Sequence, residues 1–320
     1  MYAVGLNNYG GPEVLHLVEF PDPHPEPGQV RMRVRSAGIN PVDVMVRDGS
    51  LAEFFAGLQP PFVPGMDISG TIDEVGEGHN HDFGLAVGQK VVGVVNNRGS
   101  YGGYSQYVCL PAASVIPVPA DATFPAAASF LMNALTARNA LDTLRLPPGS
   151  TLLVTGAAGA VGAYTVALAN HEGLRVVALA ELKDEVFLRA VGATEVIARG
   201  DDVARRVRRS FAAGVDGVVD TAGLRGQIVP AVRDRGTVII LRSWKNDGLE
   251  RGIQAVFVNV RDRVTDHTAI ARLGQQVSDG LLSMRVAAIF PAADAAAAHR
   301  ELAKGGLRGR IILNFDGLEE

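Results

Sequence analysis

The chain has 320 residues, 47% of them hydrophobic and 20% charged, which is typical of a globular protein large enough for two domains. Its formal net charge of −4 gives no electrostatic reason to expect nucleic acid or an anionic membrane as a partner. The single cysteine, Cys109, excludes an intramolecular disulfide and a cysteine-based zinc cluster. With no evident leader or membrane-spanning run, we expect a cytoplasmic protein.

The first part of the chain, residues 1–120, is expected to be rich in short β-strands. The runs "QVRMRVRSAGI", "ISGTIDEVG", "QKVVGVV" and "YSQYVCLP" are of strand length and are separated by segments with Pro and Gly. This rhythm predicts a small, irregular and mostly antiparallel barrel or sandwich.

From about Asp121 the pattern changes to longer units in which strands alternate with helices. Val- and Ile-rich runs such as "TLLVTG", "RVVALA", "EVIA", "GVVDTA" and "TVIIL" are separated by helical stretches, for example at 163–171 and 184–191. Such alternation predicts an α/β fold with a doubly wound parallel sheet covered on both faces. After about Val256 the alternation ends, and a helix at 292–306 and the strand "RGRIILNF" follow.

Three glycines lie where the strand "TLLVTG" meets the following helix. Gly156, Gly159 and Gly162 give the spacing G-x-x-G-x-x-G, with Ala157 in place of the first glycine of the commoner G-x-G-x-x-G. Glycine permits a tight turn and lets a pyrophosphate reach backbone N–H groups, and the helix N-terminus adds partial positive charge. We therefore predict a nicotinamide dinucleotide site. Its turn also contains Ala158, Ala160 and Val161.

Charged residues after the next two strands bear on the choice of coenzyme. Glu181 ends "RVVALA", where an acid accepts the ribose 2′-hydroxyl of NAD and repels a 2′-phosphate. Lys183 and Arg199 can pair with the 2′-phosphate of NADP, or they are solvated surface charges. Both coenzymes therefore stay open. Thr221 and Ala222, in "GVVDTAG", are expected on the adenosine or ribose side.

The chain resembles the medium-chain dehydrogenase/reductase superfamily, in its zinc-free quinone oxidoreductase branch, over nearly its full length. The segments that carry the resemblance include "GPEVLHLVEFPDPHPEPGQVRMRVRSAGINPVDVMVRDG", "PFVPGMDISGTIDEVGEG", "GGYSQYV", "LTARNAL", "VTGAAGAVG" and "GGLRGRIIL". The resemblance implies a GroES-like catalytic domain from residues 1–121 and 256–320 and a Rossmann-type nucleotide-binding domain from residues 122–255. It also implies a homodimer and slightly favours NADPH over NADH.

The resemblance allows a metal site to be tested by position. Zinc-dependent members of the family carry Cys, His and Cys where this chain has Asn40, Met66 and Met132. One amide and two thioethers are not the ligands that zinc prefers. The "HNHD" segment at 79–82 is interpreted as a polar surface turn. We expect no metal.

Without a metal, hydride transfer requires chiefly a dry, shaped pocket and a hydrogen-bond donor for the carbonyl oxygen that gains charge. Asn40 is the candidate donor and Asp43 would orient its neighbours, while Arg47 either does the same or forms a structural ion pair. By resemblance, Thr136 lines the nicotinamide pocket, unless its hydroxyl bonds its own helix. Leu241 is expected to bind the coenzyme, and Ser243, after the strand "TVIIL", is expected at the nicotinamide carboxamide. An apolar substrate pocket is expected from Met45, Leu51, Met66 and Met132.

One departure from the family concerns the proton donor. Many quinone and enoyl reductases of this group carry tyrosines where this chain has Met45 and Leu51, and nothing directs Tyr101 or Tyr104 to the nicotinamide instead. The sequence predicts a zinc-independent NAD(P)H-dependent reductase of quinones or other apolar α,β-unsaturated carbonyls. The alternatives are an enoyl or enone reductase with a different proton donor, and a coenzyme-binding regulatory module with little turnover.

Overall fold

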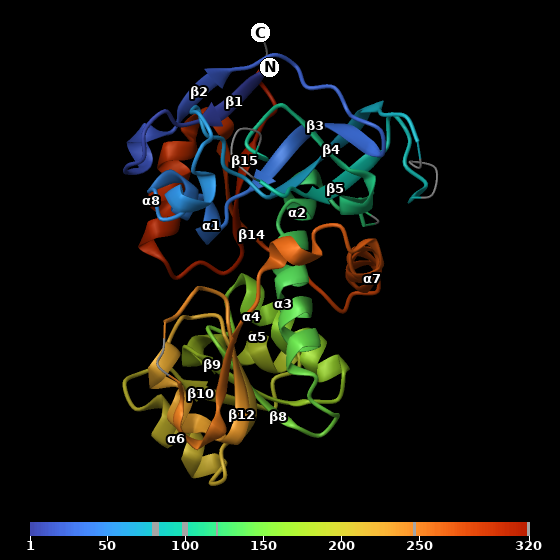
Figure 1. Ribbon diagram of the computed structural model, residues 1–320. Helices are drawn as coiled ribbons and strands as arrows, with labels where there is room; N and C mark the ends of the chain where they lie inside the picture. The colour runs from blue at the N-terminus through green and yellow to red at the C-terminus, as the bar shows by residue number, and fades with distance from the viewer. Residues whose placement is uncertain (79–82, 98–101, 120, 246–247, 319–320) are drawn as a thin grey trace. The chain divides into compact units, whose positions relative to one another are not determined.

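The computed structural model in Figure 1 divides the chain into two compact units. The first unit is Met1–Met132 with Val264–Glu320, and the second unit is Asn133–Arg263. The residues that the structure describes are 1–78, 83–97, 102–119, 121–245 and 248–318.

The second unit is built on a parallel sheet of six strands in the spatial order β10-β9-β8-β11-β12-β13. Counted from the first strand of the unit, this is the order 3-2-1-4-5-6 of dinucleotide-binding folds. All neighbours run parallel, which confirms the sheet predicted from the sequence. The strands are β8 (Thr151–Thr155), β9 (Arg175–Ala180), β10 (Glu195–Ala198), β11 (Val215–Asp220), β12 (Val232–Ile240) and β13 (Gln254–Phe257).

Helices cover both faces of this sheet. The central strands β8 and β9 are buried at nearly every successive position, as expected when both faces are covered. Right-handed crossovers put α4 (Ala160–His171) and α5 (Glu185–Ala190) on one face and α6 (Val203–Ser210) on the other. On the α6 face, Val203 and Val207 belong to the same apolar cluster as Leu153 and Val177 of the sheet.

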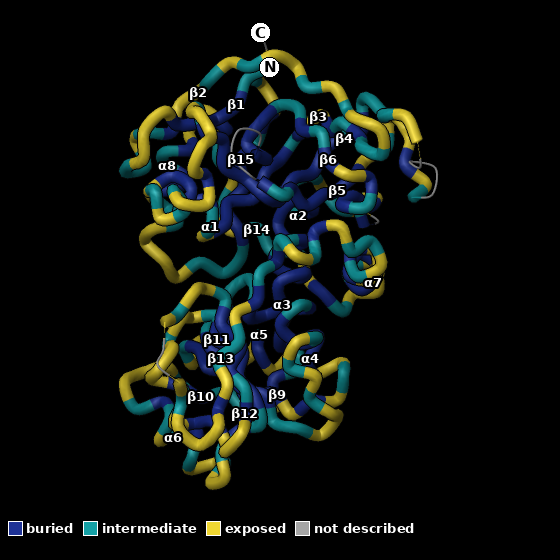
Figure 2. Tube along the Cα trace, viewed as in Figure 1, coloured by how far each residue is buried: buried dark blue, intermediate teal, exposed yellow. Residues whose placement is uncertain are grey.

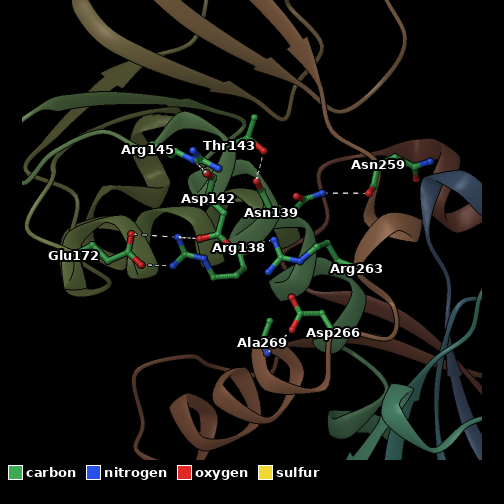
Figure 3. A network of polar contacts seen from close by, with 10 residues as sticks. All are labelled: Arg138, Asn139, Asp142, Thr143, Arg145, Glu172, Asn259, Arg263, Asp266 and Ala269. Atoms are coloured by element: carbon green, nitrogen blue, oxygen red, sulfur yellow. Dashed lines mark hydrogen bonds and ion pairs between the residues drawn. The ribbon is translucent and has the colours of Figure 1, made fainter.

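Ion pairs hold the long helix α3 (Leu131–Leu144) to the end of α4 (Figure 3). Arg138 pairs with Glu172, the C-cap residue of α4, and with Asp142 one turn further along α3 at 2.8 Å. Asp142 also accepts a hydrogen bond from Arg263 at 3.0 Å. Arg263 is the last residue of the second unit, so its bond to Asp142 attaches the end of this unit to α3.

The first unit contains a mixed sheet of seven strands, in the order β14-β15-β3-β4-β5-β7 with β6 paired to β3. Only β14 and β15 run parallel, and every other pair is antiparallel. Bulges in the pairing of β3 with β4 make the sheet irregular, as predicted. The strands are β3 (Gln29–Gly38), β4 (Asp67–Val75), β5 (Lys90–Val94), β6 (Tyr107–Pro111), β7 (Val115–Pro117), β14 (Val286–Pro291) and β15 (Arg310–Asn314).

Segments far apart in the chain meet in this sheet. β15 lies beside β3 (Figure 1) and pairs with it antiparallel. In this pairing Ile312 is opposite Gly38. The backbone of Ala128 lies close to Gly38: a Cβ at this position would be 2.4 Å from the carbonyl oxygen of Ala128, so glycine is required there. A separate two-stranded sheet pairs β1 (Tyr2–Gly5) with β2 (His16–Glu19).

Each unit has its own apolar core, seen as buried segments along the strands in Figure 2. The remaining helices, all in the first unit, are α1 (Pro41–Arg47), α2 (Phe124–Ala127), α7 (His267–Ser278) and α8 (Ala295–Lys304). Short 3-10 turns are η1 (Pro12–Val14), η2 (Ala52–Phe55), η4 (Ala112–Ser114), η5 (Leu182–Asp184), η6 (Arg225–Gln227), η7 (Val229–Ala231), η8 (Glu250–Gly252), η9 (Val260–Arg263) and η10 (Ala292–Asp294). Within the described ranges, no helix has the length and apolar character needed to cross a bilayer.

Candidate functional site

The glycine turn predicted to bind a dinucleotide joins β8 to α4 in the second unit. Gly156 has φ +57°, a left-handed backbone that favours glycine, and Gly159 is the N-cap of α4. A Cβ on Gly162 would lie 2.3 Å from the carbonyl oxygen of Gly156, so only glycine lets the helix start this close to the turn. Ala160 and Val161 form the first turn of α4, where N–H groups have no intrahelical acceptor. The turn therefore has the shape and polarity that suit a pyrophosphate.

Polar side chains at the carboxyl ends of β8 and β11 fasten this turn. Thr155 Oγ1 donates to Asp220 Oδ1 at 2.6 Å and accepts from the N–H of Ala222 at 3.0 Å. Thr221 Oγ1 donates to the carbonyl oxygen of Thr155 at 2.5 Å. Asp220, almost fully buried, accepts two further backbone N–H bonds from the loop that follows. Thr221 and Ala222 thus brace the turn from β11.

Thr155 and Asp220 were not predicted from the sequence. The available signal was that two apolar strands, "TLLVT" and "VDGVVD", each end in a polar residue. In a parallel sheet such residues share the edge at which ligands bind. Asp220 and Thr155 are adjacent there because β8 and β11 are neighbours in the register.

The three charges predicted to select the coenzyme gather at the same edge of the sheet. Glu181 directly follows β9 and forms ion pairs with both Lys183 and Arg199. The Glu181 side chain is 24% exposed, whereas those of Lys183 and Arg199 are 68% and 69% exposed. The backbone N–H of Arg199 donates to the carbonyl oxygen of Ala180 at 2.9 Å, which places Arg199 beside the end of β9. The negative charge of Glu181 is thus balanced by two exposed cations.

Three further residues were predicted to bind the coenzyme. Leu241 directly follows β12 and is half-buried, and Ser243 is exposed two residues later. Both therefore lie at the carboxyl edge of the sheet, on the β11 side of the glycine turn. Thr136 is buried in the middle of α3. Contact of these residues with the coenzyme stays a prediction.

In the first unit, the three positions at which zinc-dependent relatives carry ligands gather around one carboxylate. Asp67, next to Met66 in the chain, is fully buried. Its Oδ2 accepts from Asn40 Nδ2 at 3.1 Å, and its Oδ1 accepts from the backbone N–H of Met132 at 2.8 Å. Burial raises the pKa of Asp67 to about 6. Asp67 was not singled out in the sequence, and its partners are 27 and 65 residues away.

Asn40 and Asp43 begin helix α1 with reciprocal hydrogen bonds. Asn40 is the N-cap, and Asp43 at the third helical position accepts from the backbone N–H of Asn40 at 2.7 Å. The other carboxylate oxygen of Asp43 accepts from the N–H of Gly65 at 2.9 Å. Complete burial raises the pKa of Asp43 to about 6, opposed by these N–H donors and by the Arg310 charge. The Asn40 amide, predicted to face the substrate, here donates to Asp67 and, at 3.4 Å, to the Gly38 carbonyl oxygen.

The apolar residues predicted to line a substrate pocket form two pairs in the first unit. Met45 and Leu51 are half-buried and are joined by a hydrogen bond from the N–H of Leu51 to the carbonyl oxygen of Met45 at 3.1 Å. Met66 and Met132 flank Asp67, with Met66 only 1% exposed and Met132 half-buried. Met66 is therefore an interior residue of the first unit.

The donor set at these positions does not fit zinc. It offers two thioethers and an Asn40 amide that is already bonded to Asp67, whereas zinc prefers thiolates, imidazoles and carboxylates. Within the described part of the chain, no group of three or more His, Cys, Asp or Glu could hold a metal ion. The segment 79–82, predicted to be a polar surface turn and containing His79 and His81, lies outside the described residues, as does Tyr101.

Comparison with known proteins adds to this geometry. Residues 26–120 match the alcohol dehydrogenase GroES-like domain family, and residues 191–313 match the zinc-binding dehydrogenase family. A quinone oxidoreductase of Lama guanicoe is 26% identical over 333 residues, which cover 98% of this chain and 97% of that protein. The solved structure of a mycobacterial protein complexed with NADPH is similar with a TM-score of 0.86 and 26% identity, covering 98% of this chain and 100% of that one.

A synaptic vesicle membrane protein VAT-1 homolog-like of Mus musculus is 33% identical over 223 residues, 69% of this chain and 51% of that protein. The chain thus spans about half the length of the first curated relatives that it matches. The chain belongs to the medium-chain dehydrogenase/reductase superfamily, as its motifs predict. This also confirms the expected combination of a GroES-like fold with a Rossmann-type fold.

Proposed function

We propose that the protein is a zinc-independent NAD(P)H-dependent reductase that delivers hydride to a quinone or another apolar α,β-unsaturated carbonyl. The observation that carries this proposal is the fastened glycine turn at the carboxyl edge of the parallel sheet. Proteins named quinone oxidoreductase, similar over nearly the whole chain, favour the same chemistry. We also propose that the protein is cytoplasmic and that it forms a homodimer. Light scattering of the purified protein tests the dimer.

The second unit supplies the groups that would hold the coenzyme. The N–H groups at the start of α4 would bind the pyrophosphate, and Gly156 and Gly162 keep the turn close enough for backbone contact. Thr155 and Asp220 keep the turn fixed, so that little ordering is needed on binding. When bound, the reduced nicotinamide supplies the hydride. The residues of the chain then orient the acceptor and exclude water from the hydride transfer, and the proton that completes the reduction follows from solvent.

NADPH is the coenzyme that we propose, with NADH as a second substrate. Lys183 and Arg199 both pair with Glu181, so its charge is balanced and repels a 2′-phosphate less than an isolated carboxylate would. A 2′-phosphate would offer both cations a second anionic partner. The high exposure of Lys183 and Arg199 leaves them able to reorient toward it.

The acceptor is proposed to be apolar because the residues around the expected reaction centre are Met and Leu. Met45, Leu51 and Met132 are half-buried and adaptable in shape. Zinc is not needed in this proposal, since the donors at Asn40, Met66 and Met132 do not suit it. An enone reductase is the second candidate; because Met45 and Leu51 replace the family tyrosines, it would need a different proton donor.

The test is oxidation of NADPH and NADH by the purified protein, followed with a panel of quinones and a panel of enones. Turnover with quinones supports the proposal, and turnover restricted to enones supports the second candidate. Tight coenzyme binding with no turnover of any acceptor would instead indicate a coenzyme-binding regulatory module. If neither coenzyme bound in calorimetry, the reductase proposal would be refuted.

A further inference from the structure

A row of buried polar side chains in the first unit starts at Arg47 in α1 and returns to the same helix at Asp43. It consists of Arg47 in the last turn of α1, His299 in α8 and Tyr104 before β6. Tyr104, His299 and Asp43 are 0% exposed and Arg47 is 8% exposed. Such groups are costly to bury unless they are bonded to one another, so their arrangement requires an explanation.

The four side chains are linked one to the next. Arg47 Nη1 lies 3.3 Å from Nδ1 of His299. The other ring nitrogen of His299, Nε2, lies 3.3 Å from the Tyr104 hydroxyl oxygen, and this hydroxyl lies 3.3 Å from Oδ2 of Asp43. The rings of Tyr104 and His299 also meet edge to face, with centroids 6.0 Å apart.

The arginine fixes the direction of every hydrogen bond in this row. A guanidinium can only donate, so Nδ1 of His299 must accept and carries no proton. The proton of the neutral ring is then on Nε2, which donates to the Tyr104 oxygen, and Tyr104 donates to the Asp43 carboxylate. Burial, together with the Arg47 charge, lowers the pKa of His299 to about 3, in keeping with a neutral ring.

This row cannot conduct protons to Asp43. Its far end is an arginine, which does not release a proton at physiological pH, so a proton passed forward would leave His299 as an imidazolate. What the row delivers is an oriented hydroxyl donor. The other charges near Asp43 are Arg310, which lowers its pKa, and Asp67, which raises it.

We propose that Tyr104 and His299 are positioning residues that, through Asp43, hold the backbone at Asn40 and Gly65 in the arrangement required for hydride transfer. Asp43 uses Oδ2 for the Asn40 N–H at 2.7 Å and Oδ1 for the Gly65 N–H at 2.9 Å. These two segments carry Asn40 and Met66, both predicted at the reaction centre. The proposal therefore rests on the proposed reductase function.

The test compares His299→Gln with His299→Leu and Tyr104→Phe. Glutamine can accept from Arg47 and donate to Tyr104, as histidine does, but it cannot carry a proton onward. Leucine breaks the row, and phenylalanine removes only the Tyr104 hydroxyl. The control is His24→Gln, a histidine on the surface of the same unit. The readouts are kcat and KM for NADPH-dependent reduction and the chemical shifts of the His299 ring nitrogens and the Asn40 amide.

We expect kcat to fall about tenfold or more in Tyr104→Phe and His299→Leu with KM nearly unchanged, since misplaced reacting groups lower the rate of the chemical step. His299→Gln and His24→Gln should keep near wild-type kcat, and the His299 spectrum should show an Nε2 proton. The proposal would be overturned by an equal loss of kcat in His299→Gln and His299→Leu, by an unchanged kcat in Tyr104→Phe, or by a proton on Nδ1 of His299.

Failure of the reductase function would be recognised separately. If the wild-type protein reduced no acceptor, the proposed function would fall, while the NMR spectra would still decide the positioning. In that case His299→Leu should shift the Asn40 amide signals and His299→Gln should not. An Asn40 amide that responded to neither variant would refute the positioning role.

Discussion

The glycine at position 162 should be indispensable because of the space around it. In Gly162→Ala the new Cβ would lie 2.3 Å from the carbonyl oxygen of Gly156 and 2.7 Å from Cα of Ala157, about 1 Å short of ordinary contact. Both neighbours are backbone atoms, so no side-chain rotation can relieve the overlap. The N-terminus of α4 must move away from the turn.

Overpacking of this kind costs about 1–3 kcal/mol, while alanine is favoured over glycine within a helix by about 1 kcal/mol. We expect a net loss of about 0–2 kcal/mol in the free energy of unfolding, or up to a few degrees in Tm. Displacement of the helix N-terminus from the turn should also weaken NADPH binding by about tenfold or more.

Gly226→Ala is the matched control for this variant. Gly226 is exposed in the same unit, and its added Cβ would meet only Trp244 at 3.8 Å, an ordinary contact. Thermal unfolding of both variants with and without NADPH, together with calorimetric titration, measures the two effects. Equal stability and equal NADPH affinity in Gly162→Ala and Gly226→Ala would refute the reasoning about the turn.

Arg199→Gln should raise the Kd for NADPH about five- to tenfold and leave the Kd for NADH nearly unchanged, since an exposed cation contributes about 1 kcal/mol to a phosphate contact. Arg189→Gln on α5 is the control. An equal rise in the Kd of both coenzymes would contradict a role in binding the 2′-phosphate. Asp220→Asn should lower the free energy of unfolding, measured in urea, by about 1–3 kcal/mol, since an amide nitrogen would face a donor. The exposed Asp201→Asn should have almost no effect. Equal values for the two variants would disprove that Asp220 fastens the glycine turn. His299→Gln should gain stability relative to wild type as pH falls from about 6.5 toward 3. The pKa of His299 is lowered on folding, so its contribution to the free energy of unfolding is present above the unfolded-state pKa and is lost on acidification. If the stabilities of His299→Gln and the wild type, measured by urea unfolding, varied in parallel with pH, the ring would not be neutral.

The sequence predicted strands β8 to β12 of the second unit because each contains an apolar run between helices, whereas β13 (Gln254–Phe257) was not predicted. The coenzyme turn was equally accessible, since Gly156, Gly159 and Gly162 are local in the chain. Strand β14 was not predicted, because its half-buried positions alternate too weakly to stand out. Local apolar runs and short motifs are therefore the part of this fold that sequence reasoning captures.

The polar centre of the first unit was largely beyond prediction because its partners are distant in the chain. Arg47 and His299 are separated by 252 residues, and nothing in "AAHRELAKGG" marks the histidine as buried. Asn40 was predicted as a donor to the substrate, but folding brings Asp67 against its amide. Sequence pattern identifies which residues can donate or accept, and only the packing decides between partners.

The pairing of β15 with β3 also governs when each part of the protein can form during synthesis. Residues 133–263 are contiguous and can assemble as soon as they leave the ribosome. In the sheet begun by residues 29–38, in contrast, β6 pairs with residues 29–33 of β3, but the edge at residues 36–38 stays open until residues 310–314 arrive. The unit that begins the chain is thus the later one to complete its sheet, and until then the unpaired end of β3 is an edge that other strands can pair with.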